Sequence, residues 1–355
     1  MFQRKYLIFL TFLLLLAFAW AAGWFWMADR LRADIVDFAE IQKSNGVTLS
    51  WEKLRISGFP ISFDTDFTAP QARLDNVDRT ITWTGADASI RPFIEGPGVV
   101  SFRAPGQHNL DIREPGFDLS IKSQSDELAG RLGFDNSGEV NALRGLAEPF
   151  DLVINRRDQI GIRRAAFDFE KLSVTETNDT IHPDPVAAKL ALVLDGIDLS
   201  ALSLNDDIVD SLGSEILRAA AELSLRGSLE ADTISPRNLA RWRDSGGTVE
   251  IESLELVWGP LRFAGDGTLA LDNALQPVGA FSARISGLDK LIDLLEQRGQ
   301  VGKQQAAIAR IAMAVLNRSP ANGGPPEARV PVTIQDRVVS IGPVPLVQLD
   351  PIVWN

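Results

Sequence analysis

The chain contains no cysteine among its 355 residues. This absence excludes disulfide bonds, thiolate metal sites, cysteine nucleophiles and the lipidated cysteine of a lipoprotein. An oxidising compartment permits disulfides without requiring them, so the absence is neutral about a location outside the cytoplasm. Histidine is also scarce, with only His108 and His182. Both lie near prolines in polar stretches, and without an HExxH spacing we interpret them as solvated loop residues that hold no metal.

The common catalytic motifs are missing as well. No GxSxG elbow and no GxxxxGK(S/T) phosphate loop occurs. The segment Gly265–Ala270 matches a relaxed GxGxxA pattern, but a dinucleotide site needs a strand before this motif and a helix after it. Residues 268–271 alternate as a strand does, so we expect Asp266-Gly267 to form a hairpin turn. The sequence therefore predicts a non-enzymatic protein without a cofactor.

Paired carboxylates are the remaining candidates for chemistry. Asp64 and Asp66, and likewise Glu250 and Glu252, are two residues apart and share one face of a strand. Glycosidases need two unlike carboxylates about 5–10 Å apart across a cleft. Alternation with apolar neighbours instead predicts the polar face of a sheet. The segment 135–139 (DNSGE) resembles part of a Ca²⁺ loop, but it lacks EF-hand spacing and favours a turn. We predict no catalytic, cofactor-binding or metal-binding residue.

The charge balance is acidic. Thirty-five Lys and Arg residues face 47 Asp and Glu residues, which gives a formal net charge of −12. A surface of this sign disfavours nucleic acid and anionic lipid headgroups as broad electrostatic partners.

A charge-free run, Tyr6–Ala28, is the strongest signal in the sequence. As a helix it would extend roughly 34 Å, enough for a hydrocarbon core of ~30 Å. The basic residues on its two sides nearly balance, so the short leader with Arg4 and Lys5 favours an inside N-terminus and an outside domain. Indole rings prefer the lipid–water boundary, and three tryptophans lie near the far end: Trp20, Trp24 and Trp26.

Two alternatives compete with an uncleaved anchor. Ala19-Trp20-Ala21 fits a small-x-small cleavage site, but the apolar run exceeds the roughly 7–15 residues of a secretory signal. A buried core helix is disfavoured because the segment is apolar on every face. We expect a single-pass protein of the inner membrane with the bulk of the chain in the periplasm.

Beyond the anchor, Leu31–Gln42 has the pattern of a short amphipathic helix. From Val47 the hydrophobic period becomes two, and turn signals separate the alternating runs, which is typical of antiparallel sheet. The predicted strands of the first half begin with two runs around Val47–Trp51 and Phe59–Phe63. They continue with 80–84, 99–102, 117–122, 150–155, 160–170 and 190–194.

The second half mixes strands with helices. We expect helices over Asp206–Ala221, after the Ser235-Pro236 cap, and over Leu288–Gln297 and Gln304–Asn317. The predicted strands are 248–258, 261–264, 268–271 and 278–286, followed by a hairpin-like segment over 330–339. The expected fold is mainly β (α+β): a transmembrane helix, then a large curved antiparallel sheet with a few packing helices. We divide it into residues 1–30 (leader and anchor), 31–200 (first lobe) and 201–355 (second lobe with helices).

Apolar alternation recurs on strand after strand. One interpretation is an ordinary core between sheet and helices. The other is a curved sheet that leaves part of its apolar face as a groove for an acyl chain. The sequence does not separate the two.

Several segments carry a family resemblance. They are VTLSWEKLRISGFPISF (47–63), residues 242–271, residues 283–294 and VTIQDRVVSIGPVPLVQLDP (332–351). Together they resemble the bacterial family known as domain of unknown function 2125, found mainly in alphaproteobacteria. Ser-Gly-Phe-Pro, Trp-Gly-Pro and Gly-Pro-Val-Pro-Leu are the most specific pieces. The resemblance implies a Gram-negative cell envelope and carries no catalytic residues. The layout is also loosely similar to AsmA-like envelope proteins, which pair an anchor with β-groove segments.

These observations favour an envelope factor with a β-sheet groove for lipid or another apolar ligand. The alternative is a scaffold or assembly factor that binds another envelope protein. A hydrolase acting on envelope polymers ranks third.

The topology is directly testable. A reporter that is active only outside the cytoplasm, fused after Asn355 or near Gly323, should be active, because no second apolar run is long enough to return the chain. With an uncleaved anchor, the protein should also stay with membranes after carbonate washing. An inactive C-terminal reporter would reverse the orientation, and release by carbonate would favour the cleaved signal.

Overall fold

The computed structural model describes most of the chain, which divides into two compact units. Unit 1 comprises residues 1–140 and 150–158, and unit 2 comprises 141–149 and 159–355. The division of the β-rich part at residue 200 stays a prediction. The description covers all residues except 1, 77–78, 93–97, 136, 156–157, 173–184, 203–208, 210, 228–234, 298–301, 305, 308–309, 312–316, 319–326, 343 and 355.

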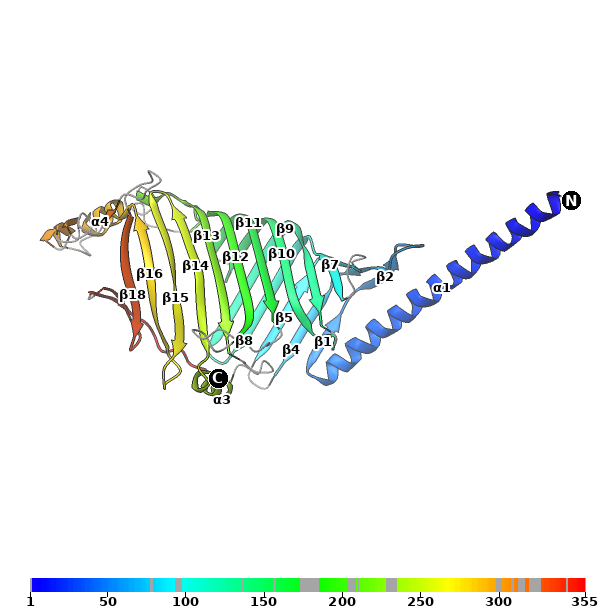
Figure 1. Cartoon of the computed structure of the whole chain (residues 1–355), viewed down its shortest axis with the longest axis horizontal. Helices are drawn as coiled ribbons and strands as arrows, with labels where there is room; N and C mark the ends of the chain where they lie inside the picture. The colour runs from blue at the N-terminus through cyan, green and yellow to red at the C-terminus, as the bar shows by residue number, and fades with distance from the viewer. Residues whose placement is uncertain are drawn as a thin grey trace. The chain divides into compact units, whose positions relative to one another are not determined.

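Unit 1 begins with one long helix, α1, over Phe2–Ser44 (Figure 1). It was expected to be an anchor followed by a separate short helix over Leu31–Gln42, and this separation is wrong. The charged residues after Ala28 favour water but do not break a helix, and no proline interrupts the run. The helix ends at Asn45-Gly46, where Gly46 adopts a φ of 85° that suits glycine.

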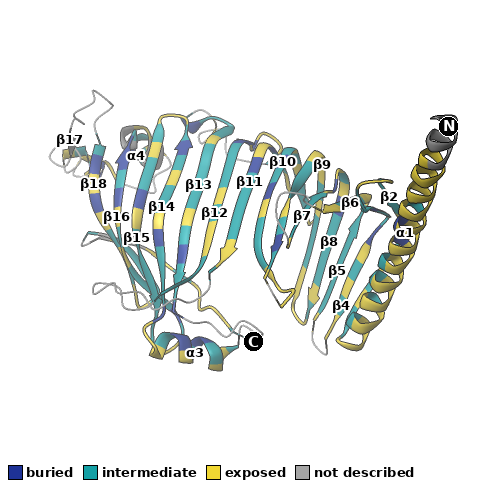
Figure 2. Ribbon diagram, turned by 45° about the vertical axis from the view of Figure 1, so that its right-hand side comes forward, coloured by how far each residue is buried: buried dark blue, intermediate teal, exposed yellow. Residues whose placement is uncertain are grey.

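A single stripe of α1 faces the rest of unit 1. Its least exposed positions recur every three or four residues, which places them on one side of the helix: Ala21, Trp24, Ala28, Leu31 and Ile35. The other faces are mostly exposed, as the yellow ribbon in Figure 2 shows. By length and composition, α1 can cross a membrane, and no second such helix occurs among the described residues.

The strands of unit 1 are β1 (Val47–Ser50), β2 (Lys53–Ser57), β3 (Asp64–Thr68), β4 (Gln71–Asp75), β5 (Thr80–Gly85), β6 (Asp87–Pro92), β7 (Val99–Arg103), β8 (Gly106–Glu114) and β9 (Phe117–Phe134). They pair antiparallel in the order β1-β4-β5-β8-β9-β7-β6-β3-β2. The two strands that end this order, β1 and β2, are adjacent in sequence, and both contact α1. The paired strands of unit 1 therefore curve back toward the helix. Strand β10 (Val140–Ile154) supplies residues to both units.

Unit 2 is an antiparallel meander. Its strands are β11 (Asp158–Lys171), β12 (Val186–Asp198), β13 (Glu215–Arg226), β14 (Thr248–Trp258), β15 (Leu261–Leu271), β16 (Pro277–Ser286), β17 (Asn317–Arg318), β18 (Glu327–Gln335), β19 (Val338–Ile341) and β20 (Val344–Gln348). Strands β11 to β16 pair in chain order, then β16 pairs with β18, β18 with β19, and β19 with β20. A buried cluster on β16 and β18 contains Ala283, Ile285, Ala328 and Val330. The mainly β, antiparallel fold class is confirmed.

Two helices of unit 2 follow their sequence signals. Helix α3 (Pro236–Asp244) begins after Ser235, whose hydroxyl accepts a hydrogen bond from the Asn238 amide, as the cap predicts. Helix α4 (Leu288–Gln297) is also confirmed. The expected helix over Gln304–Asn317 lies partly outside the described residues, and its last residue, Asn317, belongs to β17.

The helix expected over Asp206–Ala221 is wrong from Glu215 onward, where β13 begins. The segment EILRAAAEL has good intrinsic helix formers, but β13 hydrogen-bonds to β12 on one side and β14 on the other. Pairing along both edges outweighs the helix propensity of these residues. Whether a segment forms a strand depends mainly on its neighbours in the sheet and less on its intrinsic preference.

The hairpin turn expected at Asp266-Gly267 is also wrong. Residues 261–271 form one strand, β15, in which Gly267 pairs with Ile251 and Phe281. A Cβ at position 267 would lie 2.5 Å from the Ala280 carbonyl oxygen. The glycine thus permits close approach of β16 and does not mark a reversal.

Trp242 connects α3 to the sheet of unit 2. Its side chain is buried, and its indole Nε1 donates to the Arg226 carbonyl oxygen at 2.8 Å. We expect Trp242→Ala to lower the free energy of unfolding by about 3–5 kcal/mol through cavity formation. Trp242→Phe should cost much less, because it removes mainly the hydrogen bond, worth about 1 kcal/mol. Urea unfolding of the detergent-solubilised chain measures both, and equal losses would contradict this account.

Candidate functional site

An apolar groove lies in unit 1 between α1 and the sheet. The helix contributes Leu31, Asp34, Ile35 and Phe38, and the rest of the chain contributes Leu49, Phe63, Thr65, Phe67, Ile90, Pro92 and Val100. Its volume is about 450 Å³, within the range of about 300–1,000 Å³ that is usual for small-molecule sites. Asp34 is the one charged residue in the lining, and it pairs with Arg30 at 3.2 Å.

Strand alternation explains how the groove forms. In β3 and the residue before it, Phe63, Thr65 and Phe67 point to the groove, whereas Asp64 and Asp66 point to the opposite face. Thr65 pairs directly with Ile90 of β6, which extends the apolar surface across the sheet. The groove therefore consists of the helix-facing side of β1, β3, β6 and β7, covered in part by α1.

The groove is continuous with the apolar anchor along the helix. Leu31 lies three residues after Ala28, the last residue of the charge-free run, and Phe38 lies ten residues after it. At 1.5 Å per residue, the lining extends from about 4 to about 15 Å past the end of that run.

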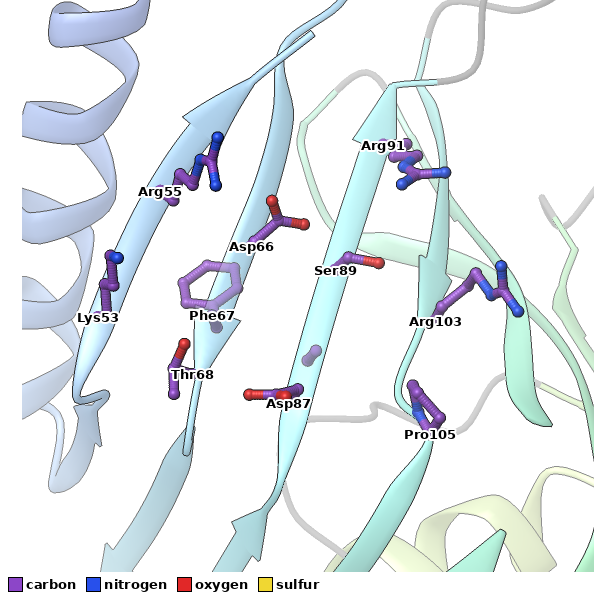
Figure 3. A pocket seen from close by; sticks show the side chains of 11 residues that line it. Lys53, Arg55, Asp66, Phe67, Thr68, Asp87, Ser89, Arg91, Arg103 and Pro105 are labelled. Carbon is purple, nitrogen blue, oxygen red and sulfur yellow. The ribbon is translucent and has the colours of Figure 1, made fainter. Parts of the chain in front are cut away.

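A second hollow, here called the basic pocket, lies on the other face of the same strands (Figure 3). Its volume is about 550 Å³. Four strands contribute one row of paired residues to it: Arg55 of β2, Asp66 of β3, Ser89 of β6 and Arg103 of β7. Four cations, Lys53, Arg55, Arg91 and Arg103, outnumber the lining carboxylates Asp66 and Asp87. The lining is thus rich in basic side chains, although the protein as a whole is acidic.

The ion pairs at the basic pocket are weak. Arg91 lies 3.3 Å from Asp64, and Arg103 lies 3.6 Å from Glu127, with both arginines more than half exposed. Such pairs contribute roughly 0–1 kcal/mol each. With Asp64 and Glu127 counted, carboxylates balance the cations of the pocket. Asp64 and Asp66 belong to a solvated, arginine-rich surface, as the polar-face interpretation predicts.

The other predicted carboxylates are held by neighbours in their own sheet. Glu250 accepts a hydrogen bond from Thr268 at 3.2 Å and lies 3.6 Å from the Arg226 Nε. Glu252 accepts from the buried Ser224 hydroxyl. Among the residues that the structure describes, no group of His, Cys, Asp and Glu could hold a metal ion.

The described residues of the acidic segment, 135 and 137–139, form a turn, as expected. The Asp135 Oδ1 accepts from the backbone N–H of Ser137 at 2.8 Å and of Glu139 at 3.0 Å. These bonds use the carboxylate to close the connection between β9 and β10.

The solvated-loop interpretation of His108 is wrong. His108 belongs to β8, is buried, and stacks on Trp83 with ring centroids 5.8 Å apart. Its Nε2 lies 2.7 Å from the Ala104 carbonyl oxygen, within hydrogen-bonding distance. His108 pairs with Gly85, which has no side chain to compete for this space. His108, Leu110 and Ile112 recur every second residue, and this period was the sequence signal that could have placed His108 on the inner face of a strand. His182 lies outside the described residues.

A smaller apolar pocket of about 260 Å³ lies in unit 2. Leu239 and Trp242 of α3 line it together with Ile352 and Trp354, near the C-terminal end. The Trp354 indole donates to the Leu275 carbonyl oxygen at 2.8 Å, so these last residues are packed onto the sheet.

One comparison with known proteins agrees with the resemblance noted in the sequence. A family model described as an uncharacterized protein conserved in bacteria (DUF2125) matches residues 24–350. The match covers most of the chain, which therefore belongs to this bacterial family. No curated protein and no solved structure matches the chain significantly.

Proposed function

We propose that this chain is a non-enzymatic factor of the Gram-negative envelope that binds a lipid acyl chain. It is anchored in the inner membrane by α1, with its β-rich units in the periplasm. The binding site is the apolar groove of unit 1. The observation that carries the proposal is the position of this groove, which begins where the charge-free part of the anchor ends.

The chemistry of the groove supports an acyl chain. Aliphatic and aromatic side chains make up most of its lining, and no cluster of hydrogen-bonding groups is available to orient a polar ligand. Burial of apolar ligand surface contributes about 25 cal/mol per Å², so even part of one chain could be held. The volume suits a single chain better than a whole phospholipid.

The location also supports transfer out of the bilayer. Phe38 lies about 15 Å beyond the end of the charge-free run, farther than bilayer acyl chains reach. A lipid chain in contact with Phe38 would therefore have left the bilayer core. The α1 helix would provide a continuous apolar path between the two environments.

The second candidate is a scaffold that binds another envelope protein. Ile311 is largely exposed, next to Arg310, which pairs with Asp293 and Glu296 of α4 at 2.6 and 2.7 Å. These ion pairs link Arg310 to α4, and the exposed apolar Ile311 beside it could contact a partner.

Photocrosslinking tests the groove. Benzoylphenylalanine in place of Phe38 should form adducts with radiolabelled lipid in intact cells, because Phe38 lines the groove. The matched control is Ile41, which lies on the same helix, is exposed to a similar extent (59% against 54%) and does not line the groove. Lipid adducts are measured by electrophoresis and mass spectrometry.

Adducts to lipid at position 38 but not at 41 support the proposal. A protein adduct at position 38 in place of lipid would favour the scaffold. Equal labelling at both positions, or no lipid adduct at position 38, would overturn the groove assignment.

A further inference from the structure

The strand expected over Phe59–Phe63 is wrong, because Gly58–Phe63 forms the connection between β2 and β3. This loop packs directly on α1. The Trp20 Nε1 donates to the Pro60 carbonyl oxygen at 3.1 Å, and the Trp24 Nε1 donates to the Ser62 carbonyl oxygen at 3.0 Å. Both tryptophans belong to the charge-free run of the anchor. The loop is therefore attached to the helix segment that would lie in the membrane.

An aromatic cluster strengthens this attachment. The Trp24 ring stacks on Phe63 with centroids 5.3 Å apart and meets Phe59 edge-on at 5.5 Å. Phe25 also stacks on Phe59 at 5.7 Å. Each such ring pair contributes roughly 0.5–1.5 kcal/mol beyond area burial, so the loop and the helix form one packed element.

The contacts define how deep the loop lies along the helix. Trp24 and Trp20 precede Ala28 by four and eight residues, which corresponds to about 6 and 12 Å along the axis. If the charge-free run spans the bilayer, the loop lies beside its last two turns. This depth resembles the roughly 5–10 Å reached by interfacial amphipathic helices.

The loop has the side chains that this depth requires. Phe59 is 50% exposed and Ile61 is 79% exposed, although both are large and apolar. The loop carries no charge, and the nearest charged residues are Arg55 on β2 and Asp64 on β3. Exposed apolar residues grouped beside a membrane helix indicate a membrane contact.

The backbone of the loop is also suited to a region of low dielectric. The Gly58 carbonyl accepts from the N–H groups of Ile61 at 3.0 Å and Ser62 at 2.9 Å. The carbonyls of Pro60 and Ser62 accept from the two indoles, and Pro60 has no N–H. Unsatisfied backbone groups are costly in lipid, and this pattern removes several of them.

We propose that Gly58–Phe63 is a second membrane contact of this chain. Phe59 and Ile61 enter the outer boundary of the bilayer that holds α1, and the upper acyl chains and glycerol region are their partner. The inference rests on the proposed membrane anchoring, but it does not require lipid in the groove. Two contacts would then join unit 1 to the membrane, the helix α1 and this loop.

The absence of cysteine permits a site-specific test on the full chain. A single cysteine is introduced by Ile61→Cys, labelled with an environment-sensitive fluorophore, and reconstituted into phosphatidylcholine vesicles. The matched control is Phe117→Cys, which is also an exposed apolar position (52%) of unit 1. Phe117 is the first residue of β9 and pairs with Glu114 of β8. The strand register places it at the same end of the sheet as Val47, the residue at which β1 begins after α1.

The label at position 61 should emit at shorter wavelength and lose most of its intensity when lipids carry doxyl groups near the top of the acyl chain. The label at position 117 should show neither effect. Both labels replace exposed side chains, so neither variant should be impaired in folding.

Three other results would overturn the proposal. A water-exposed label at position 61 in chains that float with the vesicles would remove the loop contact and leave the anchor intact. Equal quenching at positions 61 and 117 would mean that unit 1 lies flat on the bilayer without a specific contact. Failure to float would refute both the anchor and the loop.

Discussion

The packing of Trp24 against the Gly58–Phe63 loop is the contact on which the arrangement of unit 1 depends. Trp24 of the apolar anchor is buried against the β-rich part of unit 1, while its helical neighbours Phe25 and Trp26 remain exposed. A single stripe of α1 thus packs against the rest of unit 1, and the remaining surface of the helix is exposed. Because β1 and β2 also contact this helix, α1 organises the curved sheet of unit 1.

Period-two alternation then gives the same strands two different faces. On β3, Thr65 and Phe67 face the groove, and Asp66 faces the basic pocket. A hydrophobic surface and an arginine-rich polar surface are separated only by the thickness of one sheet. In the proposed orientation, the apolar face would be covered by α1, and the basic face would be open to the periplasm.

Local signals in the sequence were sufficient for much of the fold. The Ser235 cap, the β18–β19 hairpin with Asp336 and Arg337 at positive φ, and most strands follow from neighbouring residues alone. Errors arose where pairing partners distant in sequence decide the conformation. β13 is a strand because β12 and β14 flank it, and Gly267 lies within a strand because β16 approaches closely.

Only the general character of the site, an apolar face and a polar face of the sheet, could be predicted from the sequence. Alternation around Phe63 and Phe67 indicated an apolar face, and the carboxylates at 64 and 66 indicated a polar one. Which residues of α1 cover the apolar face depends on the register between helix and sheet, a long-range property that no local pattern encodes. The buried position of His108 likewise depends on Gly85, a residue on a different strand.

The uninterrupted length of α1 has a mechanical consequence. A hydrophobic segment slightly longer than the bilayer is thick accommodates the difference by tilting. The same helix continues to Ser44 and packs on the sheet of unit 1. Any tilt of the helix in the membrane would therefore rotate unit 1 with it. The distance between the groove and the membrane surface would then change with the local thickness of the membrane. Lipid composition would in this way affect how easily a lipid chain reaches the groove.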